Sequence, residues 1–410
     1  MSDHHDVVVA GAGPAGAQCA RDLAQRGYDV VVLEAEPEDE FPRQSNKSTA
    51  GTFASMMGAF GVPDDVVMQY TDDVVLESPN HHFVQEQPGA VLEFADFKQW
   101  LVAEGREQGA EYRFQARANN PITEGGEIVG VQYAGDEAVY ADVVVDATGP
   151  AAPLAKKLDV CDLERKHQAV GVEWEMEGVD VDHDGYADLH DSMMLRLDHD
   201  LAPGGYSWIF HTGGDTAKVG LCYIQSESFQ QYGDPDKGID DYLSYWMETD
   251  PRFENAEKLA GKQHRGSAHV QMPSTLSTDN FMAIGDTVPT IDPLWGEGIH
   301  KCMKSARAAA VTADRCFMAN EPDTSADALS IYDDLWHQRV APNIRTRLTM
   351  TQLLYLASNE RYDRLMTDLQ DADVDTLSGA NEGGWRSLLQ FVHASDLPLL
   401  ARFARERLAE

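Results

Sequence analysis

The residues best suited to chemistry lie near the start of the chain, where the glycine run GAGPAG occupies Gly11–Gly16. An apolar stretch precedes the run, a stretch with helical periodicity follows it, and an acid, Glu34, comes 18 residues after Gly16. In such a setting Gly11 permits a tight turn, Gly13 lets the backbone approach a pyrophosphate, and Gly16 packs the helix on the sheet. The helix N-terminus faces the anion, and Glu34 can accept hydrogen bonds from ribose hydroxyls. The run therefore predicts a dinucleotide site.

The elements that must hold this site are a strand, a helix and a second strand. Val7–Val9 and Val30–Leu33 are short continuous apolar runs, typical of parallel strands buried on both faces. Between them, Ala17–Gln25 has helical periodicity and is followed by Gly27, a typical helix stop. We expect a βαβ unit.

A second signal lies far along the chain at Gly285–Asp286, which ends the apolar stretch FMAIGD. A carboxylate after a strand can bind a ribityl hydroxyl, and the glycines of Pro293–Ile299 open a predicted helix, 298–318, whose N–H groups can face a flavin or phosphates. A third segment, Ala147–Gly149, ends a predicted strand over 138–147. Taken alone, Gly285–Asp286 could also be a simple strand-to-loop turn.

The glycine run and Gly285–Asp286 together resemble the two-part FAD site of the p-hydroxybenzoate hydroxylase-like flavoproteins. Ala147–Gly149, which lies between them in the chain, resembles the third segment of that fold. The resemblance implies FAD rather than NAD as the cofactor. It also implies an α/β fold, with a Rossmann-like FAD-binding domain, a second antiparallel-sheet substrate domain and a C-terminal helical region. We place these at 1–165 plus 270–320, at 166–269 and at 326–410.

Two stretches resemble the geranylgeranyl reductase family within that superfamily. Asp292–Ile299 is similar to the family's D/N-P-L-T-G-E-G-I run, with Trp295 in place of threonine. GYSWIFH at 205–211, followed by the strand VGL at 219–221, resembles the family's Y-x-W-x-F-P motif, with His211 in place of proline.

Strand geometry places the aromatic side chains of the second stretch, Tyr206, Trp208 and Phe210, on one face. We interpret them as the wall of a substrate cavity for a long apolar molecule. The alternative is an aromatic strand that only packs the second sheet. Tyr206 is a candidate proton donor only by its place in the motif, so no catalytic residue is assigned.

The family resemblance also implies cofactor contacts, carried over position by position. Besides the glycines they fall on Ala15, Glu34, Ala118, Asp286, Gly298 and Ile299. Archaeal members carry a cysteine where this chain has Ser45 and Asn46, which we include as cofactor-contacting candidates. The missing thiol makes a changed substrate or a weakened activity an alternative outcome.

The resemblance implies an FAD-dependent reductase that saturates isoprenoid double bonds, geranylgeranyl chains of archaeal ether lipids among them. Electrons would come from a ferredoxin-like donor or from NAD(P)H, since no second G-x-G-x-x-G run is present. Three alternatives stay open: an FAD-dependent monooxygenase on the same scaffold, a reductase of menaquinone or other isoprenoid tails, and a flavin-binding protein without turnover.

The net charge of the chain restricts the kind of environment and binding partner that it can have. Among 410 residues, 69 are acidic and 32 basic, giving a net charge of −37, which excludes a nucleic-acid reader. We infer a protein adapted to very high salt, which screens such repulsion, and the family resemblance implies an archaeal source; an acidic surface that docks a basic partner is the alternative. We find neither a spanning apolar run nor a leader, so we expect a cytoplasmic protein. The apolar stretches 353–356 and 397–403 suggest peripheral contact with the inner face of the membrane.

The rest of the pattern is less regular. We expect loops and short helices over 44–90, a helix at 96–108, and strands at 111–118 and 128–133. Five cysteines without a C-x-x-C pair argue against a disulfide framework or a metal knuckle. Asp180–Asp191 nearly matches a calcium loop, but spaced aspartates arise easily in so acidic a chain, and we predict no metal site.

Overall fold

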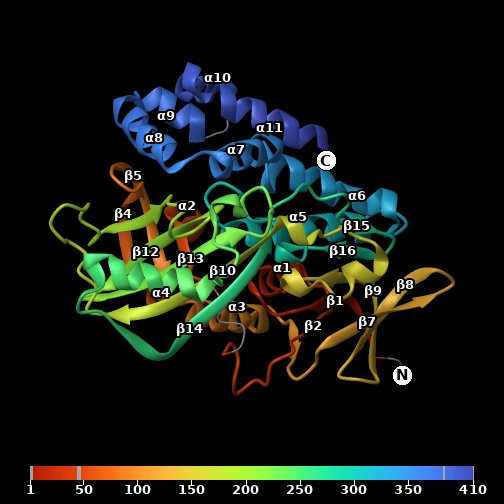
Figure 1. Ribbon diagram of the computed structural model, residues 1–410. Coiled ribbons are helices and arrows are strands. Elements are labelled where there is room, and N and C mark those ends of the chain that lie inside the picture. Colours follow the sequence, from red (N-terminus) through yellow and green to blue (C-terminus); the bar gives the residue numbers. More distant parts are fainter. Residues whose placement is uncertain (1–2, 44–47, 382–383, 410) are drawn as a thin grey trace. The chain divides into compact units, whose positions relative to one another are not determined.

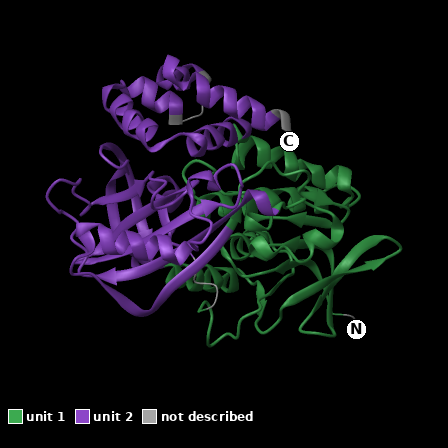
Figure 2. Cartoon of the chain, in the orientation of Figure 1, with its two compact units in different colours: residues 1–46, 94–164, 268–344 green, residues 47–93, 165–267, 345–410 purple. Residues whose placement is uncertain are grey.

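The computed structural model describes residues 3–43, 48–381 and 384–409. The chain forms two compact units, each assembled from three separate segments (Figure 2). Unit 1 comprises residues 1–46, 94–164 and 268–344, and unit 2 comprises residues 47–93, 165–267 and 345–410. Ser45 and Asn46 lie outside the described residues.

Unit 1 is built on a sheet in the order β15-β16-β9-β1-β2-β6, with β7 and β8 attached to β9. Its strands are β1 (His4–Ala10), β2 (Val30–Leu33), β6 (Glu111–Arg113), β7 (Ala118–Glu124), β8 (Glu127–Tyr133), β9 (Glu137–Asp146), β15 (Ser277–Thr278) and β16 (Phe281–Ala283). The pairs β16–β9, β9–β1, β1–β2 and β2–β6 are parallel. Residues of β1 and β2 such as Val8 and Val31 are fully buried, as expected for strands covered on both faces.

The helices of unit 1 pack around this sheet (Figure 1). They are α1 (Pro14–Ala24), α3 (Phe94–Glu107), α5 (Ile299–Phe317) and α6 (Ala326–Leu335), followed by a π-helical turn at Trp336–Val340. Helix α1 packs against both α3 and α5. The predicted βαβ unit is confirmed, although its first strand and its helix each start three residues earlier than expected. The predicted helices at 96–108 and 298–318 are confirmed to within two residues.

One predicted strand of unit 1 is wrong. Residues 111–118 contain the whole of the short strand β6 and the first residue of β7, rather than one continuous strand. The break occurs at Gln115, whose φ of 54° lies in the left-handed region and cannot continue a strand.

Unit 2 contains the second sheet, in the order β14-β10-β13-β12-β11-β4-β5-β3. Its strands are β3 (Gly51–Phe53), β4 (Val67–Glu77), β5 (His82–Leu92), β10 (Gln168–Glu177), β11 (Ser192–Arg196), β12 (Gly205–Gly213), β13 (Thr216–Ile224) and β14 (Glu257–His269). The fold class is confirmed, but the sheet is mixed rather than purely antiparallel, because β11 and β4 pair in parallel. The stretches that carry the aromatic motif and VGL are the antiparallel neighbours β12 and β13.

The expectation of loops and short helices over 44–90 is also wrong. Apart from α2 (Ala54–Phe60) and a short 3-10 turn, the region forms β3 and the long hairpin β4–β5 of unit 2. The alternation that reveals a strand is interrupted here by register shifts between Val67 and Gln69 and between Thr71 and Asp73. A bulge adds one residue to a strand and reverses the in–out pattern beyond it, so the sequence shows no clear period of two.

The two faces of the second sheet differ in chemistry. One face packs on α4 (Ile239–Thr249) through an apolar core that includes Ile209, Val219, Leu221 and Trp246. The side chains that alternate with these residues on the same strands therefore lie on the opposite face, and Tyr206, Trp208 and Phe210 are among them.

The C-terminal part of unit 2 is helical, as predicted. It contains α7 (Ile344–Leu356), α8 (Asn359–Asp371), α9 (Val374–Asn381), α10 (Trp385–Leu388) and α11 (Leu397–Ala409). Helix α8 is tied to the β4–β5 turn by Asp363, which accepts hydrogen bonds from the side chains of Ser78 and Asn80 at 2.7 and 2.8 Å. Within the described ranges, no helix is both long enough and apolar enough to cross a bilayer.

Candidate functional site

The glycine run forms the turn between β1 and α1, and each of its three glycines has a different surrounding. Gly11 has a φ of +103°, and a Cβ there would lie 2.5 Å from the carbonyl oxygen of Ala147. A Cβ on Gly16 would lie 1.9 Å from the carbonyl oxygen of Gly11. A Cβ on Gly13, in contrast, would meet no protein atom within 4 Å. Gly11 and Gly16 are thus required by packing, while Gly13 faces open space, as a phosphate approach requires.

The N-terminus of α1 fits an anion. Gly13 is its N-cap residue and gives no side-chain cap, and Pro14 occupies the first turn. The backbone N–H groups of this turn are therefore available to an external acceptor, and the helix dipole favours negative charge there.

Glu34, at the end of β2, holds the turn in place. Its side chain is 7% exposed; Oε2 accepts the N–H of Ala12 at 2.9 Å, and Oε1 accepts the N–H of Glu36 at 3.0 Å. The neighbouring segment is joined to the same residue, since the N–H of Ala116 donates to the Glu34 carbonyl at 2.7 Å. Ala118 follows two residues later and begins β7, so this strand starts close to the backbone of Glu34.

The segment Ala147–Gly149 is organised by a carboxylate that sequence reasoning missed. Asp146 is fully buried and accepts hydrogen bonds from the N–H and Oγ1 of Thr148, at 3.0 and 2.6 Å, and from the N–H of Ala155 at 2.9 Å. Burial raises the pKa of Asp146, and these donors lower it in part. A buried acid at the end of a strand, two residues before a threonine, was the available signal.

The Gly285–Asp286 segment meets the glycine run in space. Gly285 has a φ of +60°, and a Cβ there would lie 2.6 Å from the Cβ of Ala15 in α1. The hydroxyl of Thr287 accepts the N–H of Gly149 at 3.1 Å. The three segments that the sequence analysis singled out are therefore brought together within unit 1.

The N-terminus of α5 completes the group. Gly298 is its N-cap residue, and a Cβ there would be 4.0 Å from Oδ1 of Asp286. Burial raises the pKa of Asp286 to about 6, although the Cys302 thiol, 3.6 Å away, lowers it in part. A carboxyl that is costly to ionise when buried gains from a hydroxyl donor, which is what a ribityl chain offers.

Two further carboxyl groups of this helix start were missed as functional candidates. Oδ1 of Asp292 accepts the N–H groups of Leu294 and Trp295 at 3.1 and 3.2 Å, which fixes the turn before α5. Glu297 accepts the N–H of His300 at 2.5 Å, and burial raises its pKa to about 7. The feature of the sequence that could have indicated these two residues is the presence of two acids, five positions apart, on either side of the Trp295–Gly296 pair.

The predicted aromatic wall lies on β12 in unit 2. The rings of Tyr206 and Trp208 are 5.8 Å apart, Trp208 is buried, and the other two side chains are half-buried. Phe210 sits so close to β3 that a Cβ on Gly51 would be 2.4 Å from its ring. The shared face is as predicted from strand geometry; the role as a substrate wall remains a prediction.

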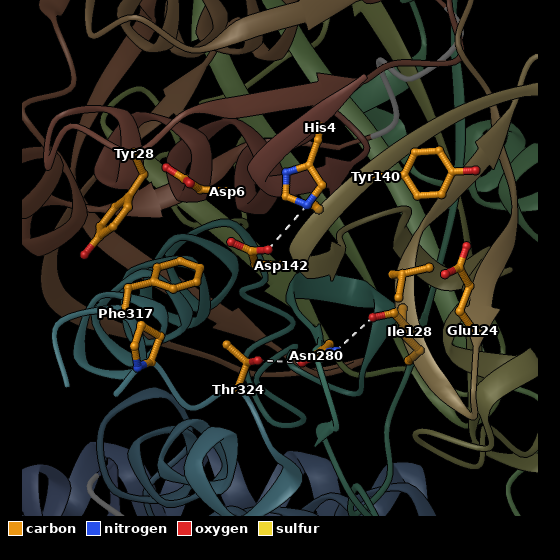
Figure 3. Close-up of a pocket in the computed structure, with 13 residues that line it drawn as sticks. His4, Asp6, Tyr28, Glu124, Ile128, Tyr140, Asp142, Asn280, Phe317 and Thr324 are labelled. Atoms are coloured by element: carbon orange, nitrogen blue, oxygen red, sulfur yellow. Dashed lines mark hydrogen bonds and ion pairs between the residues drawn. The ribbon is translucent and has the colours of Figure 1, made fainter. Parts of the chain in front are cut away.

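One pocket of unit 1 lies elsewhere. It has a volume of about 840 Å³ and is lined by residues that include His4, Tyr140, Asp142 and Phe317 (Figure 3). His4 begins β1, whereas the glycine turn follows the end of that strand. Ligands of such sheets bind at the carboxyl ends of the strands, so this hollow is not the candidate cofactor site.

The calcium-like stretch at 180–191 has the structure of a packed loop. Asp180 pairs with His183 and Asp188 with His190, each at 2.8 Å, while Val181 and Leu189 join the apolar core of unit 2. Across the parts of the chain that the structure describes, no three His, Cys, Asp or Glu side chains are grouped to hold a metal ion.

Taken together, these features fit FAD: two glycine positions closed by packing, a third open to a phosphate, an uncapped helix start, and a buried carboxyl beside a second helix start. The fold and the site define an FAD-dependent oxidoreductase of the p-hydroxybenzoate hydroxylase-like type. Family models agree, matching residues 6–65 as an FAD dependent oxidoreductase and residues 170–262 as a geranylgeranyl reductase catalytic domain.

Known proteins narrow the class to a family. The chain is 65% identical over 406 residues to the digeranylgeranylglycerophospholipid reductase of Haloferax volcanii, with 99% of each chain covered. The chain therefore belongs to the digeranylgeranylglycerophospholipid reductase family. The adaptation to high salt predicted from the charge, and the archaeal origin implied by the family resemblance, fit the source of this relative.

Solved structures share the fold at low identity. A geranylgeranyl bacteriochlorophyll reductase-like protein from Thermoplasma acidophilum superposes with a TM-score of 0.84 at 21% identity, covering 98% of this chain and 100% of that one. The flavin-dependent brominase Bmp2 gives 0.73 at 22% identity, covering 93% and 94%.

Proposed function

We propose that this chain reduces the geranylgeranyl double bonds of archaeal ether phospholipids, with FAD as its cofactor. The observation that carries the proposal is the full-length identity of 65% to a digeranylgeranylglycerophospholipid reductase, in a chain whose three cofactor segments meet within unit 1. Bound FAD, once reduced by an electron donor, would supply a hydride to one alkene carbon while a proton reaches the other. The protein's own tasks are to hold the cofactor, orient the chain and exclude water.

Named residues perform the first task in this proposal. Gly13 gives the pyrophosphate access to the N-terminus of α1, and Ala15 lies in the first turn of that helix. Glu34 accepts hydrogen bonds from the ribose and Asp286 from the ribityl chain, while Gly298 and Ile299 offer N–H groups at the start of α5. Asp146 and Asp292 act indirectly, because each fixes a turn through backbone N–H groups.

The second task falls to the face of the second sheet that carries Tyr206, Trp208 and Phe210. The three aromatic rings offer apolar surface on one face, next to the buried polar side chains of Glu173, Glu175 and Lys218. Such a surface suits an isoprenoid chain, whose carbons gain free energy by leaving water.

Reduction of the purified protein under anaerobic conditions in multimolar salt tests the function. The bound flavin is reduced with dithionite, unsaturated ether lipid is added, and flavin absorbance and lipid mass are followed. We expect reoxidation together with a gain of two hydrogen atoms per double bond. A flavin that stays reduced until air is admitted would contradict the proposal. Replacing dithionite by NAD(P)H or by reduced ferredoxin, in parallel samples, identifies the electron donor.

The isoprenoid lipid of this proposal is a membrane component, and we propose that the C-terminal helices make a peripheral contact with the membrane. Four large apolar side chains in this region are exposed: Val374, Leu389, Val392 and Leu397, from 44% to 80%. Exposed apolar side chains that project from a helical surface can insert into the interface of a bilayer. Of the two stretches suggested by the sequence, 353–356 is unsuited to this contact because Tyr355 and Leu356 are buried, whereas 397–403 begins with the exposed Leu397.

The distribution of charge supports the same contact. Residues 345–410 contain ten acidic residues and eight arginines, so they carry a net charge of −2 out of −37. With a net charge of −2 over 66 residues, against −37 over 410, this region would meet less repulsion from anionic lipid headgroups than the chain does on average. In α11, three arginines outnumber the single acid Glu406 within Leu397–Ala409.

Flotation with vesicles of anionic ether lipid tests the contact. Changing Leu389, Val392 and Leu397 to aspartate together is expected to remove most of the bound protein. Met318, at the end of α5 and 76% exposed, is the matched control, because Met318→Asp alters an equally exposed apolar side chain in unit 1. Equal flotation of all three proteins would contradict the contact.

A further inference from the structure

A row of three residues crosses the strands that carry the proposed wall. Trp208 on β12 lies opposite Gly220 on β13, and Gly220 lies opposite Glu173 on β10. All three positions therefore share the face that turns away from the apolar core of unit 2. None of the cofactor segments uses Glu173.

The indole of Trp208 lies across this row. A Cβ on Gly220 would be 2.4 Å from Cζ2 of the indole, so the ring occupies the place where a side chain would stand. The far edge of the ring reaches β10, where a Cβ on Gly171 would be 3.8 Å from it. The indole ring therefore packs flat over these two glycines, which have no side chains to displace it.

A hydrogen bond fixes the ring in this position over the glycines. The indole N–H donates to Oε2 of Glu173 at 3.0 Å, and both side chains are buried. A buried indole N–H without an acceptor costs free energy, so loss of the carboxylate would favour a different ring orientation. Within the described residues, Oε1 of Glu173 has no hydrogen-bond partner.

Another glutamate on the same strand shows that this arrangement is not simple charge pairing. Glu175 lies on the same face, but it pairs with His264 at 3.0 Å and with Lys262 at 3.3 Å. Burial raises the pKa of Glu175, and these partners and Lys218 outweigh it, so the net pKa is lowered. Glu173 accepts from the indole instead, and a buried carboxylate is costly to keep for packing alone.

We propose that Glu173 is a positioning residue that holds the indole of Trp208 flat on Gly220 and thereby shapes the surface on which the isoprenoid chain lies. The inference rests on the proposed function, because it takes the aromatic face as the substrate wall. Glu173 acts through Trp208, and its hydrogen bond sets the fit of the chain more than the rate of the chemical step.

A double-mutant cycle in the full-length holoprotein tests this role. Glu173→Leu removes the acceptor, Glu173→Gln keeps a carbonyl acceptor, and Trp208→Phe keeps a ring but removes the donor. We expect E173L to raise KM for a geranylgeranyl lipid about tenfold with little change in kcat, and E173Q to restore most of it. In the W208F background E173L should have little further effect, because the partner is gone.

The outcomes that overturn the proposal are distinct. An E173L effect that is equally large in the W208F background, or an E173Q variant as impaired as E173L, means that Glu173 does not act through the indole. Glu177→Gln, an exposed change at the end of the same strand, is the matched control, and melting temperature and FAD content show whether each variant is folded.

A second readout separates this proposal from the proposed function. Near-ultraviolet circular dichroism reports the environment of the indole without any substrate. We expect E173L to lose a band that E173Q retains and that W208F also lacks. If the wild-type protein reduces no isoprenoid but this pattern holds, the function fails and the positioning of Trp208 stands. Identical spectra for E173L and the wild type overturn the positioning itself.

Discussion

The two sheets carry their candidate chemistry in different ways. In unit 1 the proposed cofactor contacts come mostly from the backbone: glycines at a turn, two helix N-termini and N–H groups at the ends of strands. In unit 2 the candidate wall is made by side chains in the middle of strands, where aromatic rings lie beside the buried polar groups of Glu173, Glu175 and Lys218.

The difference teaches which changes each unit tolerates. A site made by backbone depends on where a Cβ can stand, so it fails by steric conflict at glycine positions. A site made by buried side chains depends on hydrogen-bond partners, so it fails when one partner is removed and the other stays unpaired. Four predictions test this contrast.

The largest effect is expected at Arg252 in unit 2. This guanidinium is fully buried and donates to Glu77 at 2.9 Å and to Asp250 at 2.8 Å. Arg252→Met leaves both carboxylates without it and should lower the free energy of unfolding by about 3–5 kcal/mol. Urea unfolding in high salt measures the change. Arg265→Gln, which breaks an exposed pair with Asp240, should cost under about 1 kcal/mol; equal costs would break the comparison.

A smaller effect is expected when a side chain is added beneath the indole. Gly220→Ala places a Cβ 2.4 Å from the Trp208 ring and 2.5 Å from the Val172 carbonyl oxygen. We expect a loss of about 2 kcal/mol in unfolding free energy and a changed tryptophan signal. Gly58→Ala in α2, where a Cβ meets nothing within 4 Å, should be neutral or stabilising. An unchanged tryptophan signal in the Gly220 variant would argue against the flat packing of this ring.

The next effect concerns the cofactor alone. Gly13→Ala adds a methyl group that touches no protein atom, so the melting temperature of the apoprotein should not change. FAD affinity should fall about tenfold, because the methyl group stands where the pyrophosphate approaches. Flavin titration and thermal melts measure the two quantities. Gly16→Ala should instead impair folding itself. If both variants changed the apoprotein melting temperature equally, the distinction between a cofactor position and a packing position would be contradicted.

The smallest effect is a pH dependence at the start of α5. Burial raises the pKa of Glu297 to about 7, from 4.5 in an unfolded chain. Its contribution to stability is therefore present below about pH 4.5 and is lost as the pH rises to about 7. The apoprotein should lose more stability between about pH 5 and 7.5 than Glu297→Gln does, by about 1 kcal/mol or less because the carboxyl is partly exposed. Parallel thermal melts of both proteins check the difference, and identical slopes would contradict it.

Much of the first unit could be predicted from the sequence, because its signals are local. The spacing of Gly11, Gly13 and Gly16 after a buried strand gives the turn and the helix without knowledge of any distant contact. That Gly285 would pack against Ala15 could be expected only from the order of the segments and the family resemblance.

The parts that the sequence did not reveal depend on distant partners. The hairpin β4–β5 was missed because its bulges hide the alternation of a strand. The link between Glu173 and Trp208 joins residues 35 positions apart and requires the register of three strands. Asp146 was missed because its importance lies in three donors, two of them backbone N–H groups, that no residue pattern specifies.

The division of each unit into three segments has a consequence for synthesis. The chain passes between the two units five times, at about residues 46, 93, 164, 267 and 344. Unit 1 therefore lacks its last helices until the ribosome has made residue 344, and unit 2 waits for the final 66 residues. Neither unit can be expressed as one uninterrupted fragment, and a nascent chain of this protein must hold partly built sheets in solution for most of its translation.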